Sequence, residues 1–187
     1  QYMVEHERAP GVGMLAGWGY SARPLRLNSR GLGEICVTVT FALLVVGADF
    51  VQRGSIGDTP LWAGLGYALL TTNILYINQF PDRVADLAVG KNHWVARLSP
   101  ASARWGYPLI MLLALAMVLV PVALGALRSG ALLALPAFAL SLLAARSLLA
   151  NADNPSALTP AIQQTIIAAH LAAVLVAIGL VAQRLLA

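Results

Sequence analysis

Long apolar runs alternate with short polar segments along this chain, and the apolar positions do not form the stripes of amphipathic helices. Five runs are long enough to cross a hydrocarbon core, which requires about 20 helical residues. We place them near residues 33–52, 61–80, 105–127, 129–150 and 161–183. No segment shows the period of two that a membrane β-strand requires. The pattern predicts an all-α fold, a polytopic transmembrane helical bundle formed by one membrane domain over residues 1–187.

The composition supports a membrane protein and excludes several other classes. Of the 187 residues, 59% are apolar and 11% are charged, whereas about 25% are charged in an ordinary soluble domain. The single cysteine, Cys36, excludes an internal disulfide and a cysteine-based zinc cluster. A net charge of +4 would suggest nucleic-acid binding in a soluble chain. Because the basic residues here lie between apolar runs, we expect them to orient the protein in a lipid bilayer, with no nucleic-acid partner.

The basic residues also predict which way the bundle faces. One side of the predicted topology carries Arg23, Arg26, Arg30, Arg83, Lys91, Arg97, Arg104 and Arg146, and the other carries Arg53, Arg128 and Arg184. Basic residues accumulate on the cytoplasmic side of membrane proteins. The sequence therefore predicts a multi-pass protein of the inner (cytoplasmic) membrane. A partial helix over residues 11–20 would run inward to the first basic loop.

The second predicted span ends in an unusual cluster of polar residues. Asn78, Asp82 and Asp86 recur every four residues, so a continuing helix would stack them on one face. Two carboxylates one turn apart repel each other unless a cation lies between them. Oxygen ligands suit Mg²⁺, which also accepts phosphate oxygens of a substrate. Alternatively, these carboxylates belong to a solvated loop and balance Arg83 and Lys91, and the spacing alone does not decide between the two.

Polar residues inside the span favour a site. Thr71, Thr72, Asn73 and Tyr76 precede the cluster at membrane depth, where polar side chains tend to face a bundle interior or a water-filled cavity. The loop before the first span adds Arg23, Arg26 and Arg30, whose guanidinium groups could neutralise a diphosphate. On their own, the arginines of this loop are explained by their role in orienting the protein in the membrane and by binding of anionic lipid. Together with the two aspartates, it describes a site for a lipid diphosphate.

Two segments resemble one family. Residues 78–91 (NQFPDRVADLAVGK) resemble the second aspartate-rich motif of the UbiA prenyltransferase superfamily, and residues 96–98 match its usual continuation. Residues 20–34 (YSARPLRLNSRGLGE) resemble the menaquinone-type branch, which prenylates dihydroxynaphthoate. The resemblance extends over about residues 20–105. The family's first motif, an Asn followed by two Asp at four-residue spacing, is absent from this sequence, and we expect it in residues upstream of Gln1.

The resemblance implies a nine-helix intramembrane enzyme, of which this chain would be roughly the C-terminal two-thirds. Mg²⁺ would be held by the catalytic residues Asp82 and Asp86 and would bind the diphosphate of a polyprenyl donor. The diphosphate would also be bound by Asn78, Lys91, Arg23, Arg26 and Arg30. An aromatic acceptor, dihydroxynaphthoate in the first instance, would attack the allylic carbocation on the cytoplasmic side. Homogentisate, hydroxybenzoate and other phenolic acceptors remain open.

Two other functions compete with the prenyltransferase. A transporter fragment could use Thr71, Asn73 and Asn78 to line a path, although these residues gather at one end of one span. A membrane scaffold without catalysis would account for the absent first motif. His93, which follows the aspartate-rich segment, is interpreted as an ordinary loop histidine.

Overall fold

The computed structural model describes residues 17–186, and all regular structure within them is helical. The long helices are α2 (Gly33–Arg53), α3 (Asp58–Ala88), α6 (Gly106–Ala123), α7 (Leu135–Asn151) and α8 (Thr159–Leu185). The short elements are η1 (Leu27–Arg30), α4 (Trp94–Arg97), α5 (Pro100–Ala103), η2 (Ser129–Ala134) and η3 (Pro155–Leu158). The predicted all-α fold is confirmed. Residues 17–21 are helical, and the rest of the predicted partial helix lies outside the described residues.

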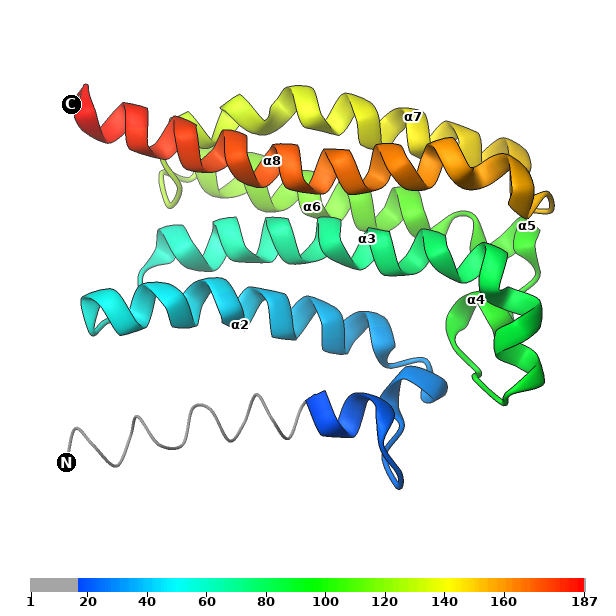
Figure 1. The fold of residues 1–187 in the computed structure, drawn as a ribbon. Coiled ribbons are helices and arrows are strands. Elements are labelled where there is room, and N and C mark those ends of the chain that lie inside the picture. Colours follow the sequence, from blue (N-terminus) through cyan, green and yellow to red (C-terminus); the bar gives the residue numbers. More distant parts are fainter. Residues whose placement is uncertain (1–16, 187) are drawn as a thin grey trace.

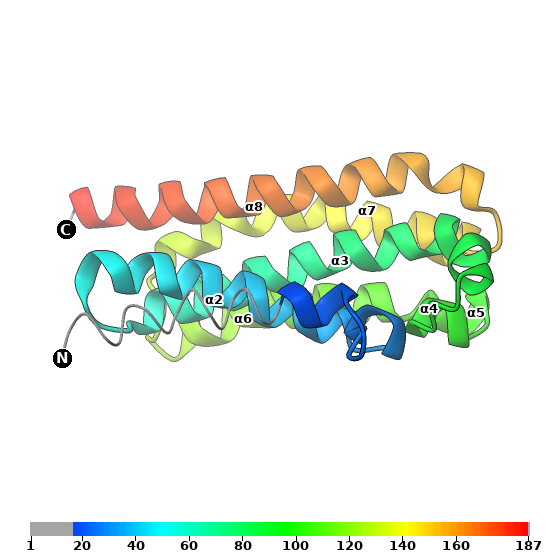
Figure 2. The same ribbon diagram turned by 60° about the horizontal axis from the view of Figure 1, so that its bottom comes forward.

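The five long helices lie side by side with their axes roughly aligned (Figures 1 and 2). Helix α3 is the central element, because it packs against α2, α6 and α8. The short helices α4 and α5 gather at the end of the bundle where α3 finishes (Figure 1). The C-termini of α2 and α8 lie at the opposite end (Figure 1). The bundle therefore has two distinct ends, and α3 connects them.

Four helical stretches are long and apolar enough to cross a membrane: Gly33–Arg53, Pro100–Ala123, Ser129–Asn151 and Pro155–Leu185. They confirm four of the five predicted spans. The fifth, residues 61–80, lies within α3, whose 31 residues extend about 46 Å, but α3 is not among the apolar four. Its central position is the reason, since a helix covered by neighbours can carry polar side chains that a lipid-facing helix cannot.

The polar residues of α3 face the bundle interior, as predicted. The Thr72 and Thr38 hydroxyl groups lie 2.7 Å apart and join α3 to α2. The Asn73 amide nitrogen donates to the Tyr107 carbonyl oxygen of α6 at 3.2 Å. The Tyr76 hydroxyl donates to a backbone carbonyl of α5 at 2.7 Å. Hydrogen bonds between membrane helices contribute about 0.6–2 kcal/mol each, so this polar run holds α3 against three neighbours.

Candidate active site

Helix α3 continues without interruption through Pro81 and ends at Ala88. Pro81 has no N–H for the helical ladder, but the break it could have caused does not occur. Asn78, Asp82 and Asp86 therefore lie on the same face of one helix, four residues apart, as the spacing predicts.

The two aspartates differ in their surroundings. Asp86 is largely buried, with Oδ1 lying 2.6 Å from the Lys91 ammonium group and Oδ2 lying 3.1 Å from Nε2 of His93. Asp82 is exposed and makes no hydrogen bond or ion pair with other residues in the described part of the chain. One carboxylate is thus already oriented by the protein, and the other is free to meet a ligand.

The chain reverses direction directly after α3 and so returns to Asp86. Gly90 adopts φ of 76°, the left-handed conformation that glycine accepts without steric cost and that commonly ends helices. The Lys91 backbone N–H donates to the Asp86 carbonyl oxygen at 2.9 Å. This turn brings both Lys91 and His93 to the Asp86 side chain.

His93 is not an ordinary loop histidine, and that interpretation is wrong. Its ring is only 3% exposed, and Nδ1 accepts the Ala96 backbone N–H at 3.2 Å, which caps α4. The contact with Asp86 could not be read from the sequence, because it depends on the reversal at Gly90. A polar residue just before a short helix was the one available signal.

The two segments that resembled the family meet in space. The Asn92 backbone N–H donates to the Ser29 carbonyl oxygen at 3.1 Å, and the Trp94 indole N–H donates to the Gly31 carbonyl oxygen at 2.7 Å. Residues 28–33 therefore dock on residues 91–97, at the end of the bundle that carries Asp82 and Asp86.

Tyr20 belongs to the same junction. Burial raises the pKa of its hydroxyl group, and the nearby Glu34 carboxylate and Cys36 raise it further, while the Lys91 ammonium group lowers it. The Tyr20 hydroxyl is thus within electrostatic reach of both the first span and the turn after α3. It stays protonated at neutral pH.

The three arginines of the loop are not brought onto the aspartates. Arg30 donates to the Pro24 carbonyl oxygen at 2.8 Å, and Arg26 has φ of 42° before η1, while Arg23 is exposed. Within residues 17–186, no ion pair joins any of them to Asp82 or Asp86. The loop lies at the predicted end of the bundle, and the role of its guanidinium groups stays a prediction.

The Asn78 side chain makes its hydrogen bond within its own helix, α3. Its side-chain nitrogen donates to the Ile74 carbonyl oxygen at 2.7 Å, and the residue is half-buried. Its assignment to the diphosphate also stays a prediction.

Two contacts near the site were not foreseen. The Gln79 amide donates to Oε1 of Glu34 at 2.8 Å, and both side chains are buried, with Oε2 of Glu34 and Oε1 of Gln79 lacking partners. The Arg83 guanidinium donates to the carbonyl oxygens of Val95 and Leu98 at 3.0 and 3.2 Å. The first pair joins the start of α2 to the end of α3, and the second fixes α4 beside α3. Antiparallel pairing of the first two spans was the signal that could have suggested the Glu34 contact.

The carboxylates at this end of the bundle fit a metal ion whose remaining ligands are substrate oxygens. They do not fit an ion that is surrounded by protein ligands alone. In the described part of the chain, no group of three or more His, Cys, Asp and Glu side chains is arranged to hold a metal ion. Mg²⁺ is usually held by one or two carboxylates together with water and phosphate oxygens. Asp82 and Asp86 on one helix face satisfy that requirement, because a carboxylate has about four lone-pair sites and Asp86 uses two of them.

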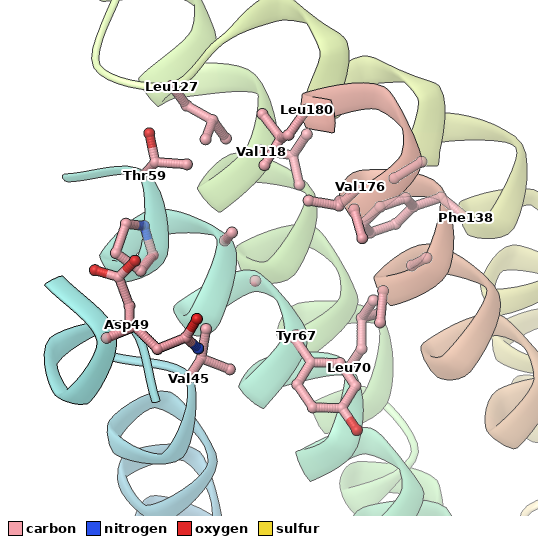
Figure 3. A pocket seen from close by; sticks show the side chains of 18 residues that line it. Val45, Asp49, Thr59, Tyr67, Leu70, Val118, Leu127, Phe138, Val176 and Leu180 are labelled. Carbon is pink, nitrogen blue, oxygen red and sulfur yellow. The ribbon is translucent and has the colours of Figure 1, made fainter. Parts of the chain in front are cut away.

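An apolar cavity of about 450 Å³ lies among α2, α3, α6, α7 and α8 (Figure 3). Tyr67 and Leu70 of α3 line it together with Val176 and Leu180 of α8. Asp49, near the end of α2, and Thr59, at the start of α3, add polar atoms to the cavity (Figure 3). Leu70 is about 18 Å from Asp82 along the helix axis, at about 1.5 Å per residue.

Comparison with known proteins agrees with the motifs. The family model described as the UbiA prenyltransferase family matches residues 10–163. A 2-carboxy-1,4-naphthoquinone phytyltransferase of Synechocystis sp. is 33% identical over 89 residues, which are 47% of this chain and 29% of that protein. A 1,4-dihydroxy-2-naphthoate octaprenyltransferase of Haemophilus influenzae is 37% identical over 75 residues, 40% of this chain and 24% of that protein.

The Escherichia coli protein named 1,4-dihydroxy-2-naphthoate octaprenyltransferase is 32% identical over 95 residues, 50% of this chain and 31% of that protein. The chain thus spans less than a third of the length of the curated relatives it matches. No solved structure matches it.

Proposed function

The chain belongs to the UbiA prenyltransferase family, and on that premise we propose that it carries the second aspartate-rich half of a Mg²⁺-dependent prenyltransferase site. Its four long apolar helices and its family make it an integral membrane protein. The reaction would move a polyprenyl group from a polyprenyl diphosphate to a dihydroxynaphthoate-like acceptor, in quinone biosynthesis. The names of the relatives support this acceptor class.

The observation that carries the proposal is the meeting of acidic and basic groups at one end of the bundle. Asp82 has no hydrogen-bond or ion-pair partner among residues 17–186, and Asp86 lies 2.6 Å from the Lys91 ammonium group. An ammonium group has three donors, so Lys91 could keep its bond to Asp86 while it donates to a phosphate oxygen. Asp82 and Asp86 would hold Mg²⁺, and the chemistry that such an ion would supply is charge stabilisation of the leaving group.

The reaction balances as an electrophilic aromatic substitution. The allylic C–O bond of the donor breaks, and its electron pair leaves with the diphosphate. A ring carbon of the electron-rich acceptor then forms the new bond to the allylic carbon. The same ring carbon loses its proton, or its carboxyl group as CO₂, and the electron pair of that broken bond restores the aromatic ring. The apolar cavity lined by Leu70, Val176 and Leu180 would hold the distal part of an isoprenoid chain, because Leu70 lies about 18 Å along α3 from Asp82.

The distribution of charge supports a cytoplasmic site in the inner membrane. Lys91 and Arg97 follow the C-terminus of α3, and the loop with Arg23, Arg26 and Arg30 docks there through residues 28–33. Arg53 and Arg184 lie in the last turns of α2 and α8, at the other end (Figure 1). By the positive-inside rule, this distribution supports a cytoplasmic position for the Asp82 end.

The structure does not favour a transporter. The polar groups that would line a path are used elsewhere: the Thr71 hydroxyl donates to the Tyr67 carbonyl at 3.0 Å, and the Asn73 amide donates to α6. Asn73 is 1% exposed. The Asn73 side chain thus joins α3 to α6, and the Thr71 hydroxyl is bonded within α3, so neither group is left to line a path.

The proposed function is tested by transfer in lipid nanodiscs with polyprenyl diphosphate and dihydroxynaphthoate. We expect prenylated product and released diphosphate in equal amounts, loss of both on chelation with EDTA, and recovery with Mg²⁺. Homogentisate and hydroxybenzoate serve as competing acceptors. Product formation that persists in EDTA would refute the metal requirement, and flux across proteoliposomes without diphosphate release would support a transporter instead.

A further inference from the structure

We propose that His93 is a positioning residue, which holds the Asp86 carboxylate and the adjoining turn in the arrangement that receives a divalent cation. The inference rests on the proposed function and deepens it. It assigns a role to a buried histidine that neither binds the cation nor touches the diphosphate.

The hydrogen bonds of His93 assign one ring nitrogen as an acceptor and the other as a donor. Nδ1 lies 3.2 Å from the Ala96 backbone nitrogen, which can only donate, so Nδ1 is an unprotonated acceptor. The single ring proton is then on Nε2, which donates to Oδ2 of Asp86 at 3.1 Å. Both ring nitrogens are therefore used.

A fixed donor suits a carboxylate that must also bind a cation. The Nε2–H bond to one oxygen restricts rotation of the Asp86 side chain. Lys91, on the other oxygen, is charged and partly exposed, so it can shift towards a phosphate. His93 is 3% exposed and has no such freedom.

His93 also fixes the turn that presents Lys91. Its two hydrogen bonds join the last turn of α3, through Asp86, to the first turn of α4, through Ala96. Lys91 lies between these two anchor points, after the Gly90 reversal. Loss of the Nε2–H bond would therefore loosen Asp86 and let Lys91 move, even though α4 remained capped.

Two substitutions separate the two hydrogen bonds. His93→Asn places an oxygen near the position of Nδ1 and keeps a good helix cap, but it removes the donor to Asp86. His93→Gln places an amide nitrogen near the position of Nε2 and keeps that donor. His170→Asn is the matched control, because His170 is an exposed histidine of α8 whose one hydrogen-bond partner among the described residues is the Ile166 carbonyl oxygen.

The test measures the histidine and the metal separately, on the full chain in nanodiscs. Two-dimensional ¹H–¹⁵N NMR reports the tautomer of His93, and electron paramagnetic resonance reports Mn²⁺ binding. We expect the Nε2–H tautomer in the wild type.

Mn²⁺ should bind 10- to 100-fold more weakly to His93→Asn, the usual cost of losing a group that orients a metal ligand. The Mn²⁺ affinities of His93→Gln and His170→Asn should stay near that of the wild type. In transfer assays, His93→Asn should require more Mg²⁺ for half-maximal rate, with a smaller change in kcat.

Each other outcome contradicts the inference. A proton on Nδ1 overturns it, and so does wild-type Mn²⁺ binding by His93→Asn. Equal weakening of Mn²⁺ binding by His93→Asn and His93→Gln also overturns it, because it would indicate that only the bulk of the ring matters. Mn²⁺ binding that survives in both Asp82→Asn and Asp86→Asn would instead refute the proposed metal site itself. The two failures are therefore distinguishable.

Discussion

At the scale of single residues, the site is organised around Asp86. Lys91 and His93 each take one of its oxygens, at 2.6 and 3.1 Å, and both reach it through the turn at Gly90. Asp82, one helical turn earlier, is exposed and has no such partners within residues 17–186. The pair thus combines one oriented carboxylate with one adaptable carboxylate.

Lys91→Gln should weaken binding of the polyprenyl diphosphate. Hydrogen bonds to charged groups contribute about 1.5–3 kcal/mol, so we expect the KM for the diphosphate to rise about 10- to 100-fold, with little change in the KM for the aromatic acceptor. Lys91→Arg should be intermediate, because it keeps the charge. Arg128→Gln, at the opposite end of the bundle, is the control. A rise in the acceptor KM alone would show that Lys91 serves the other substrate.

Gln79→Leu should destabilise the bundle, because it leaves the buried Glu34 carboxyl group without its amide donor. An unsatisfied buried polar group costs about 1–3 kcal/mol, and more when it is charged. The measurement is the thermal unfolding temperature in detergent. The double variant Glu34→Leu/Gln79→Leu should recover much of the loss, since neither partner is then left unpaired. A Gln79→Leu protein as stable as the wild type would contradict the contact.

At the scale of elements, helix packing depends on close backbone approaches that only glycine permits. Gly179 of α8 lies against Gly130 of η2, and a Cβ on Gly179 would clash with the Gly130 carbonyl oxygen. A Cβ on Gly66 of α3 would meet only ordinary contacts, the nearest being the Ala114 carbonyl oxygen at 3.7 Å. The two glycines therefore differ in what they contribute.

Gly179→Ala should lower the unfolding temperature, because α8 and η2 must separate to admit the methyl group. Gly66→Ala should leave it unchanged or raise it, since alanine is favoured over glycine in a helix by about 1 kcal/mol. Both are measured by thermal unfolding in the same detergent. Equal effects of the two substitutions would contradict the packing of α8 on η2.

The elements also show what the sequence could predict. Uninterrupted apolar runs predicted four spans to within a few residues, and the four-residue spacing predicted the common face of Asp82 and Asp86. The docking of residues 28–33 on residues 91–97 could not be predicted, because it depends on two chain reversals and on side chain to backbone bonds. The role of His93 could not be predicted either, because it arises from the burial of the side chain and not from a pattern of residues in the sequence.

At the scale of the whole molecule, the two ends of the bundle should face opposite sides of the membrane. Asp153 lies in the exposed loop between α7 and η3, and Arg128 is exposed just before η2. In a Cys36→Ser background, Asp153→Cys should react with a membrane-impermeant maleimide only from the cytoplasmic side, and Arg128→Cys only from the other side. The reverse labelling would invert the proposed orientation and place the site outside.

The central claim is that Asp82 and Asp86 hold the cation that activates a prenyl diphosphate. Its most direct test is the rate of prenyl transfer by Asp82→Asn and by Asp86→Asn, each compared with Asp153→Asn, an exposed aspartate with the same substitution. We predict that both site variants lose turnover by at least about 100-fold, the scale of several kcal/mol that a metal ion contributes, while Asp153→Asn keeps the wild-type rate and all variants insert in the membrane. Wild-type rates in both site variants would contradict the account.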